Sequence, residues 1–106
     1  MHEKNIYLWS MLDAIEKIVS YTDESDLRAF EQNSMMHDAC LMQFQHIGEI
    51  ANKTQEKFPE IELPYRDIIW FRNFIAHEYL GIELIDVWET ILHDLPKLRE
   101  QIRGQM

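Results

Sequence analysis

Only one cysteine, three glycines and three prolines occur among the 106 residues of the chain. A single thiol cannot form an internal disulfide, and Cys40 stands among apolar neighbours, where a small core residue is favoured over a nucleophile. The scarcity of Gly and Pro leaves little material for the turns of a β-protein, so helices are favoured. At this length the chain is expected to form one domain, residues 1–106, with one hydrophobic core.

The chain also lacks a long apolar run and an excess of basic residues. No segment approaches the roughly 18 apolar residues that span a bilayer, and acidic residues interrupt the N-terminal stretch where a signal peptide needs an apolar segment. We therefore expect a cytoplasmic protein. The formal net charge of −9 argues against a surface of massed Lys and Arg, so any contact with RNA must be local. A solvated acidic surface is the simplest interpretation of this charge.

Apolar residues recur every three or four positions in four stretches, which is the spacing of amphipathic helices. The first stretch covers residues 5–20, and the second, the longest, covers residues 35–58. Ser34 is the candidate N-cap of the second helix, and Pro59 ends it. Between these two helices, residues 26–31 favour one short helical turn within a polar loop.

The second half of the chain contains the other two helices. Pro64 suits the first turn of a third helix over residues 65–79, and Gly81 is its expected end. The fourth stretch covers residues 84–102, where Pro96 should kink the helix or start a new one. The pattern predicts an all-α, up-and-down bundle of four main helices, with a fifth short helix possible.

Four aromatic and Met side chains lie off these stripes. They either pack in the core or leave apolar surface that a homodimer would cover. They are Trp9, Met36, Met42 and Trp70.

The third helix interleaves polar and apolar side chains in the stretch "WFRNFIAHEYL", residues 70–80. At about 100° per residue, Asn73 and His77 share one stripe, whereas Arg72 lies about 140° from His77. The long Arg side chain, a distortion near the helix end or a second subunit must close this gap. The opposite side of the helix, which includes Trp70, can dock on the rest of the bundle.

These polar side chains suit phosphodiester cleavage without a metal. Histidine exchanges protons near neutral pH, and arginine offers charged planar donors to phosphate oxygens. His77 would take the proton of a ribose 2′-hydroxyl or protonate the leaving oxygen, and Arg72 would stabilise the charge on the phosphate. Asn73 would orient His77 or the phosphate, and Tyr79 would position the nucleotide. On spacing alone, a His and an Arg on a helix more often form an ordinary surface pair.

The segment "RNFIAHEY" has the pattern R-x-x-x-x-H-x-Y and resembles the signature of the HEPN superfamily, in its HepT-like branch. Further segments of that branch are similar to "QHIGEIANK", "ELPYRDIIWFRN" and "VWETILHDLPKLREQI", so the likeness covers nearly the whole chain. The resemblance implies a helical-bundle homodimer in which the Arg and His pairs of two protomers share a cleft. A two-fold cleft of this kind would also close the 140° gap.

The resemblance further implies a metal-independent endoribonuclease, the toxin of a type VII toxin–antitoxin pair. The implied partner is an MntA-like minimal nucleotidyltransferase, the antitoxin, which silences the toxin by adding AMP to the motif Tyr (AMPylation). In this sequence Arg72 and His77 would be catalytic, Asn73 accessory and Tyr79 the modified residue.

Several neighbouring residues have more than one interpretation. Arg66 and Lys53 could form an RNA-contacting rim or be ordinary surface charges. Glu49 lies near the cleft, as the resemblance implies, or pairs with Lys53 one turn further on. His46 and Glu49 have a spacing that metal-binding bundles use, but no second convincing pair accompanies them, so neither a metal nor another cofactor is expected.

Two other functions stay open on the sequence. The bundle could be a non-catalytic module that binds a nucleotide or substrate and partners a minimal nucleotidyltransferase. It could also be a structural dimer without a ligand, although the polar face of the third helix would then have no purpose.

Overall fold

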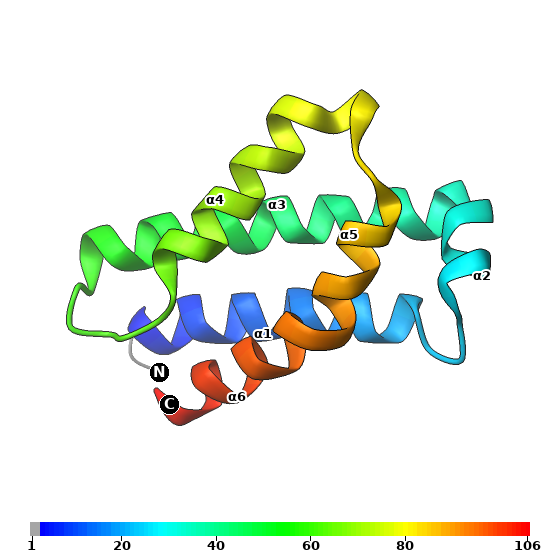
Figure 1. The fold of residues 1–106 in the computed structure, drawn as a ribbon. Coiled ribbons are helices and arrows are strands. Elements are labelled where there is room, and N and C mark those ends of the chain that lie inside the picture. The colour runs from blue at the N-terminus through cyan, green and yellow to red at the C-terminus, as the bar shows by residue number, and fades with distance from the viewer. Residues whose placement is uncertain (1–2) are drawn as a thin grey trace.

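The computed structural model describes residues 3–106 and consists of helices joined by short connections (Figure 1). The elements are α1 (Glu3–Tyr21), α2 (Leu27–Gln32), α3 (Ser34–Lys57), α4 (Tyr65–Glu78), the 3-10 turn η1 (Tyr79–Gly81), α5 (Leu84–Glu89), the π-helical segment η2 (Thr90–Asp94) and α6 (Leu95–Gly104). No strand occurs within the described residues. Since α5, η2 and α6 follow one another without a break, the chain has four long helical stretches and the short α2. The predicted all-α class is therefore confirmed.

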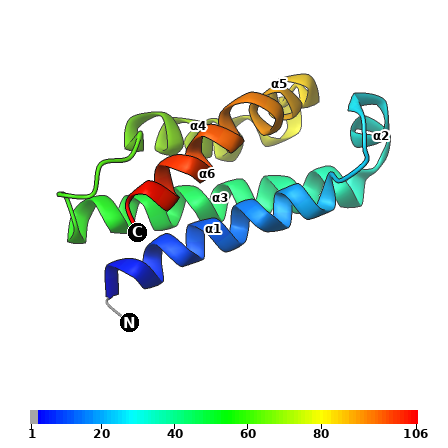
Figure 2. The ribbon, with the colours of Figure 1, turned by 90° about the horizontal axis from the view of Figure 1, so that it is seen from below.

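The helices lie in two layers (Figure 2). One layer contains α1 and α3, which run side by side in opposite directions, and the other contains α4 and the α5–α6 stretch. Within this arrangement α4 packs on α3, and α6 packs on α1. Consecutive long helices alternate in direction, as expected for an up-and-down bundle, and α1 begins at the same end of the molecule at which α6 finishes (Figure 1).

The core lies between the layers and is built from the apolar stripes seen in the sequence. Its most buried large side chains are Leu8, Met11, Ile15, Ile18, Phe30, Ile75, Val87 and Ile102. Cys40 is also fully buried, and burial raises the pKa of its thiol to about 12. Because the thiolate is the nucleophilic form, this cysteine is an inert core residue, as predicted.

Side-chain caps set the starts of two helices. The Asp26 carboxylate accepts a hydrogen bond from the backbone N–H of Ala29 at 2.8 Å and caps α2. The prediction of Ser34 as the cap of α3 is wrong by one residue. Asn33 has an extended backbone, and its side-chain oxygen accepts from the N–H of Met36 at 3.0 Å. Ser34 is therefore the first residue of the helix rather than its cap.

The connection before α4 fixes where this helix starts. Pro64 directly precedes it, close to the predicted place, and the Tyr65 N–H donates to the carbonyl of Leu63 at 2.8 Å. The Tyr65 hydroxyl donates to the Ile61 carbonyl, also at 2.8 Å. Burial raises the pKa of Tyr65, and the charge of Glu60 adds to this effect. The phenol therefore stays a neutral donor that holds the first turn of α4 to its connection.

Only one side of α4 is covered. Ile75 is fully buried, and the Phe71 ring meets the Phe44 ring of α3 edge to face, with centroids 5.0 Å apart. Trp70 is 63% exposed and stacks on Phe74 instead. Of the two expectations for Trp70, docking on the bundle is wrong and exposed apolar surface is confirmed, because α4 packs on α3 and leaves this indole beyond their contact.

The other off-stripe side chains divide between surface and core. Trp9 and Met42 are more than half exposed, whereas Met36 packs against the core. No helix among the residues described is both long and apolar enough to cross a membrane.

Pro96 lies in the first turn of α6, directly after the π-helical segment. Proline has no N–H to donate to the carbonyl four residues earlier and its ring crowds that carbonyl. A wider π turn just before the proline accommodates both effects, so a new helix begins here, which was one of the two predicted outcomes.

The burial of Ile75 predicts a large effect on stability. Ile75→Ala should lower the free energy of unfolding by about 2–5 kcal/mol, because it removes buried methyl groups at the α3–α4 contact. Leu80→Ala is the matched control, since Leu80 is 99% exposed a few residues further on, and should change stability by less than about 0.5 kcal/mol. Urea unfolding followed by circular dichroism measures both. Equal effects of the two changes would contradict the packing of α4.

Candidate active site on helices α3 and α4

Helix α4 crosses α3 at the point where Arg72 meets a glycine of α3. Gly48 is buried in α3, and a Cβ added to it would lie 2.5 Å from Cγ of Arg72 and nearer still to its Cβ. Because no side chain fits there, α4 approaches α3 closely and the aliphatic stem of Arg72 lies against Gly48. This close contact fixes where the guanidinium emerges from the helix pair.

The Arg72 guanidinium lies at the edge of the contact and keeps unused donors. Its Nη1 donates to Oδ1 of Asn73 at 3.1 Å, and its Nη2 lies 3.6 Å from Oε1 of Glu49. The second separation exceeds an ordinary hydrogen bond, and the Glu49 side chain is about half exposed, so this ion pair contributes at most about 1 kcal/mol. Nε is buried without an acceptor among residues 3–106. A ligand does not reach this buried donor, but Nη1 and Nη2 each carry a second N–H that is available to it.

A polar hollow of about 380 Å³ lies beside these groups. Its lining residues are Gly48, Glu49, Asn52 and Lys53 of α3 and Ile69, Arg72 and Asn73 of α4. Lys53 therefore lines the same hollow as Arg72. Arg66 is exposed in the first turn of α4 and does not line the hollow. Glu49 lies near Arg72, and within residues 3–106 it has no ion pair with Lys53, so the predicted pairing with Lys53 is not formed.

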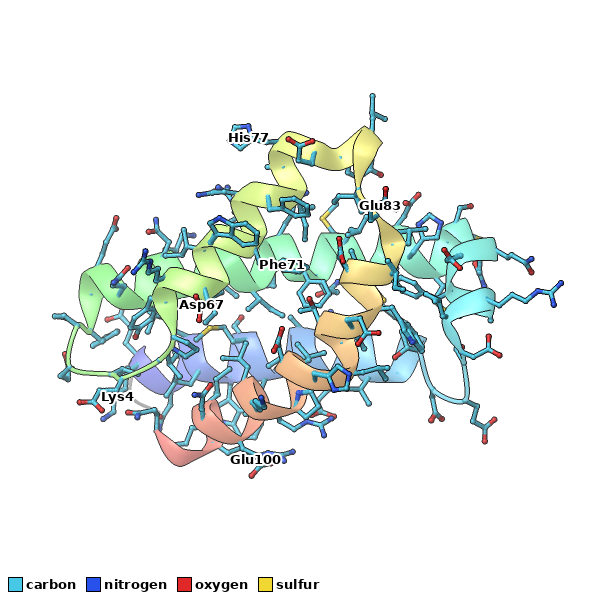
Figure 3. All side chains as sticks on the ribbon, in the orientation of Figure 1. Lys4, Asp67, Phe71, His77, Glu83 and Glu100 are labelled. Carbon is cyan, nitrogen blue, oxygen red and sulfur yellow. The ribbon has the colours of Figure 1, made fainter. Side chains whose placement is uncertain are left out.

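His77 lies apart from this hollow. It is exposed in the last turn of α4, and its ring projects away from the bundle into solvent (Figure 3). Within the described part of the chain it has no hydrogen bond or ion pair. Five residues of helix separate it from Arg72 by about 7.5 Å along the axis and about 140° around it. One chain therefore does not bring the two predicted catalytic groups together.

Tyr79 begins the 3-10 turn that follows α4. The helix ends at Glu78, one residue before the predicted end, and the turn finishes at Gly81. The Tyr79 side chain is 49% exposed, and the neighbouring Leu80 is almost fully exposed. The phenol is therefore accessible to a second protein.

A larger groove of about 700 Å³ lies between α4 and the α5–α6 stretch. Its floor is apolar and includes Phe71, Phe74 and Leu98, and four carboxylates lie on its rim. These are Asp67, Asp86, Glu89 and Asp94. The groove forms because α4 packs on α3 and makes no comparable contact with α5 or α6.

Sequence reasoning missed three residues of the polar hollow, Gly48, Asn52 and Ile69. Gly48 carried a usable signal, because a glycine inside a helical pattern costs about 1 kcal/mol and often marks a close approach of backbones. Asn52 carried no such signal in the sequence, although it lies four residues after Gly48 and so on the same face of α3.

No group of three or more His, Cys, Asp or Glu side chains within residues 3–106 is placed to hold a metal ion. The carboxylate of Glu49, which the sequence offered as a partner of His46 in metal binding, is directed to Arg72 instead.

Comparison with known proteins assigns the chain to a family. The family model described as "Ribonuclease HepT-like" matches residues 11–104. The candidate RNase MJ1380 of Methanocaldococcus jannaschii is 29% identical over 100 residues, which are 91% of this chain and 90% of the relative. The "Probable ribonuclease HepT" of Thermococcus cleftensis is 27% identical over 95 residues, 88% of this chain and 86% of the relative. No solved structure matches the chain significantly. The chain belongs to the HepT-like ribonuclease family.

The contact at Gly48 predicts an unusual response to substitution. Gly→Ala inside a helix ordinarily stabilises by about 0.5–1 kcal/mol. Gly48→Ala should instead lower the free energy of unfolding, because its Cβ overlaps the stem of Arg72. Gly104→Ala is the control, since an added Cβ there meets nothing within 4 Å. Urea unfolding of both variants measures the difference, and a stabilised Gly48→Ala would show that α3 and α4 do not approach so closely.

Proposed function

We propose that the protein is a metal-independent endoribonuclease in which Arg72 and His77 act on a phosphodiester of RNA. The observation that carries the proposal is the Arg72 guanidinium, which keeps unused donors beside a polar hollow. An exposed imidazole follows five residues later on the same helix. Membership of the HepT-like ribonuclease family supports this reading of the pair.

The chemistry uses the 2′-hydroxyl of the RNA as the nucleophile. His77 takes its proton as the 2′-oxygen attacks phosphorus, and the 5′-oxygen leaves after receiving a proton, which gives a 2′,3′-cyclic phosphate and a free 5′-hydroxyl. Arg72 donates to the phosphate oxygens, on which negative charge increases in the transition state. Asn73 accepts from Arg72 and so orients the guanidinium.

Two chains complete the site in this proposal. Because His77 projects into solvent on a different side of α4 from Arg72, each His is paired with the Arg of the second protomer across a two-fold axis near α4. The exposed indole of Trp70 and the apolar floor of the α4 groove offer area for such pairing.

The toxin–antitoxin assignment also belongs to the proposal. Tyr79 is accessible and lies two residues after His77, so an MntA-like nucleotidyltransferase could transfer AMP to its hydroxyl. The adenylate would place negative charge and bulk beside the cleft and would compete with RNA for the guanidinium of Arg72. Modification of one exposed residue would thus silence the toxin.

A non-catalytic nucleotide-binding module is the second candidate. It is favoured by the placement of Arg72 in a hollow that His77 does not line. Such a module would bind RNA or nucleotide at α3 and α4 without cutting it.

Removal of either catalytic side chain should abolish cleavage. We expect His77→Ala to slow RNA cleavage by about 10²–10⁴-fold and Arg72→Ala by about 10²–10³-fold, because the proton carrier or the charge stabiliser is lost. Cleavage of a fluorescent RNA pool by purified protein measures this. His93→Ala and Arg28→Ala are matched controls, since both residues are exposed on other helices, and they should retain full rates.

Mixing the two inactive variants tests the shared cleft. If Arg72 and His77 act across protomers, half of the randomly mixed dimers carry one intact site, and about one quarter of the wild-type rate should return. No recovery in a mixture shown to exchange subunits would contradict the two-fold site. Full activity in either single variant would refute the ribonuclease assignment, and binding without any cleavage by the wild type would favour the binding module.

Tyr79 is expected to be the modified residue. Co-expression with a cognate nucleotidyltransferase should add the mass of one or more adenylates to the wild type and none to Tyr79→Phe, because the Phe variant lacks the acceptor hydroxyl. Intact mass spectrometry measures the gain. Tyr21→Phe is the control, since Tyr21 is also exposed but lies at the end of α1. The same mass gain in Tyr79→Phe would move the modification to another residue.

A further inference from the structure

The polar hollow between α3 and α4 has the composition of a site for the RNA backbone. It contains two cations, Lys53 and Arg72, two side-chain amides, Asn52 and Asn73, and the carboxylate of Glu49. At about 380 Å³ it has room for more than the single phosphate that Arg72 would hold during cleavage. The residues that α3 contributes are therefore available to the next phosphate of the same RNA strand.

Lys53 is the second positive charge of this hollow and is not neutralised by an acidic partner. Residues 3–106 give it no ion pair, whereas Lys17 is paired with Asp13 and Lys57 with Glu3. Arg72 and Lys53 come from different helices, so they present two separate charges along the hollow rather than one. Two adjacent phosphates of a single RNA strand likewise present two separate negative charges, one for each of these cations.

Glu49 stands where a phosphate oxygen would bind. Its carboxylate oxygen lies 3.6 Å from Nη2 of Arg72, and it is four residues before Lys53 on the same face of α3. The contact is loose and half exposed, so a phosphodiester, which has the same single negative charge and two free oxygens, can take its place. The carboxylate also holds the guanidinium on the side of the hollow.

We propose that the hollow binds two consecutive phosphates of single-stranded RNA, the scissile one at Arg72 and its neighbour at Lys53 and Asn52. Glu49 is a positioning residue, whose carboxylate pairs with the Arg72 guanidinium until an RNA phosphate takes its place. This inference rests on the proposed ribonuclease function for the identity of the ligand, but it assigns residues of α3 that the Arg–His pair does not include.

Equilibrium binding tests the inference without cleavage. The full chain carrying His77→Ala is titrated into a fluorescein-labelled single-stranded RNA decamer, and anisotropy is followed between 50 and 200 mM salt. Lys53→Gln should weaken binding about fivefold at 0.1 M salt and reduce the slope of log Kd against log salt by about 0.7, because one phosphate contact is lost. Glu49→Gln should tighten binding about threefold, because the competing charge is removed while the side-chain length is kept.

Lys17→Gln is the matched control, since it removes the same charge from α1, where Lys17 already pairs with Asp13. An equal loss of affinity in Lys17→Gln and Lys53→Gln would overturn the subsite, because general charge would then account for both. Unchanged or weaker binding by Glu49→Gln would overturn its assigned role, as would an absence of RNA binding by the His77→Ala protein. Circular dichroism confirms that each variant is folded.

The two proposals fail separately. If the wild type cleaves RNA but Lys53→Gln and Glu49→Gln bind as well as their parent, the ribonuclease stands and the second phosphate site is wrong. If the two variants shift affinity in opposite directions while the wild type cuts no RNA, the phosphate site stands and the nuclease is wrong.

Discussion

The close contact between Gly48 and Arg72 is the constraint on which the candidate site depends. The distance between packed helices is set by the side chains at their crossing, and a glycine permits the closest approach. Here the partner at the crossing is the stem of an arginine, so packing holds the aliphatic part of Arg72 while its charged end stays at the surface. The protein thereby orients a cation without bearing the full desolvation cost of burying it.

This arrangement separates the two groups that the motif brings close in sequence. Packing on α3 fixes one side of α4, and Arg72 lies at its edge, whereas His77 is in the last turn, beyond the part of α4 that α3 covers. An α-helix rotates about 500° over five residues, so a regular helix directs these two side chains about 140° apart. The spacing is therefore better suited to a cleft to which two chains contribute than to a site within one chain.

The regular features of the fold could be predicted from the sequence, because periodic burial and proline positions are local signals. The helices, Pro64 and the new start at Pro96 follow from them. The sequence left Trp70 open between core and surface for a physical reason: periodicity identifies an apolar face but does not tell how many neighbours cover it. Ser34 was mispredicted for a different reason. Asn33 is an equally good cap, and only the backbone conformation decides between the two residues.

The site was predictable only in part, because its members come from two different helices, α3 and α4. The motif pointed to the residues of α4, but the contribution of α3 depends on the register at which the helices cross. That register is set by Gly48, which brings Glu49, Asn52 and Lys53 to the Arg72 side. Once the crossing point is known, the remaining residues follow from helical spacing.

The same crossing accounts for how an acidic chain could bind RNA. Several of its cations are neutralised by neighbouring carboxylates, as Lys17, Arg99 and Arg103 are, and add little to a positive potential. The cations of the hollow differ, because Lys53 has no acidic partner within residues 3–106 and Arg72 has only a loose one. At about 0.15 M salt, charges more than about 8 Å away are largely screened, so the acidic surface far from the hollow has little effect on a phosphate bound there. Affinity that depends on so few contacts would be modest and sensitive to salt, and binding would be confined to strands flexible enough to enter the hollow between the two helices.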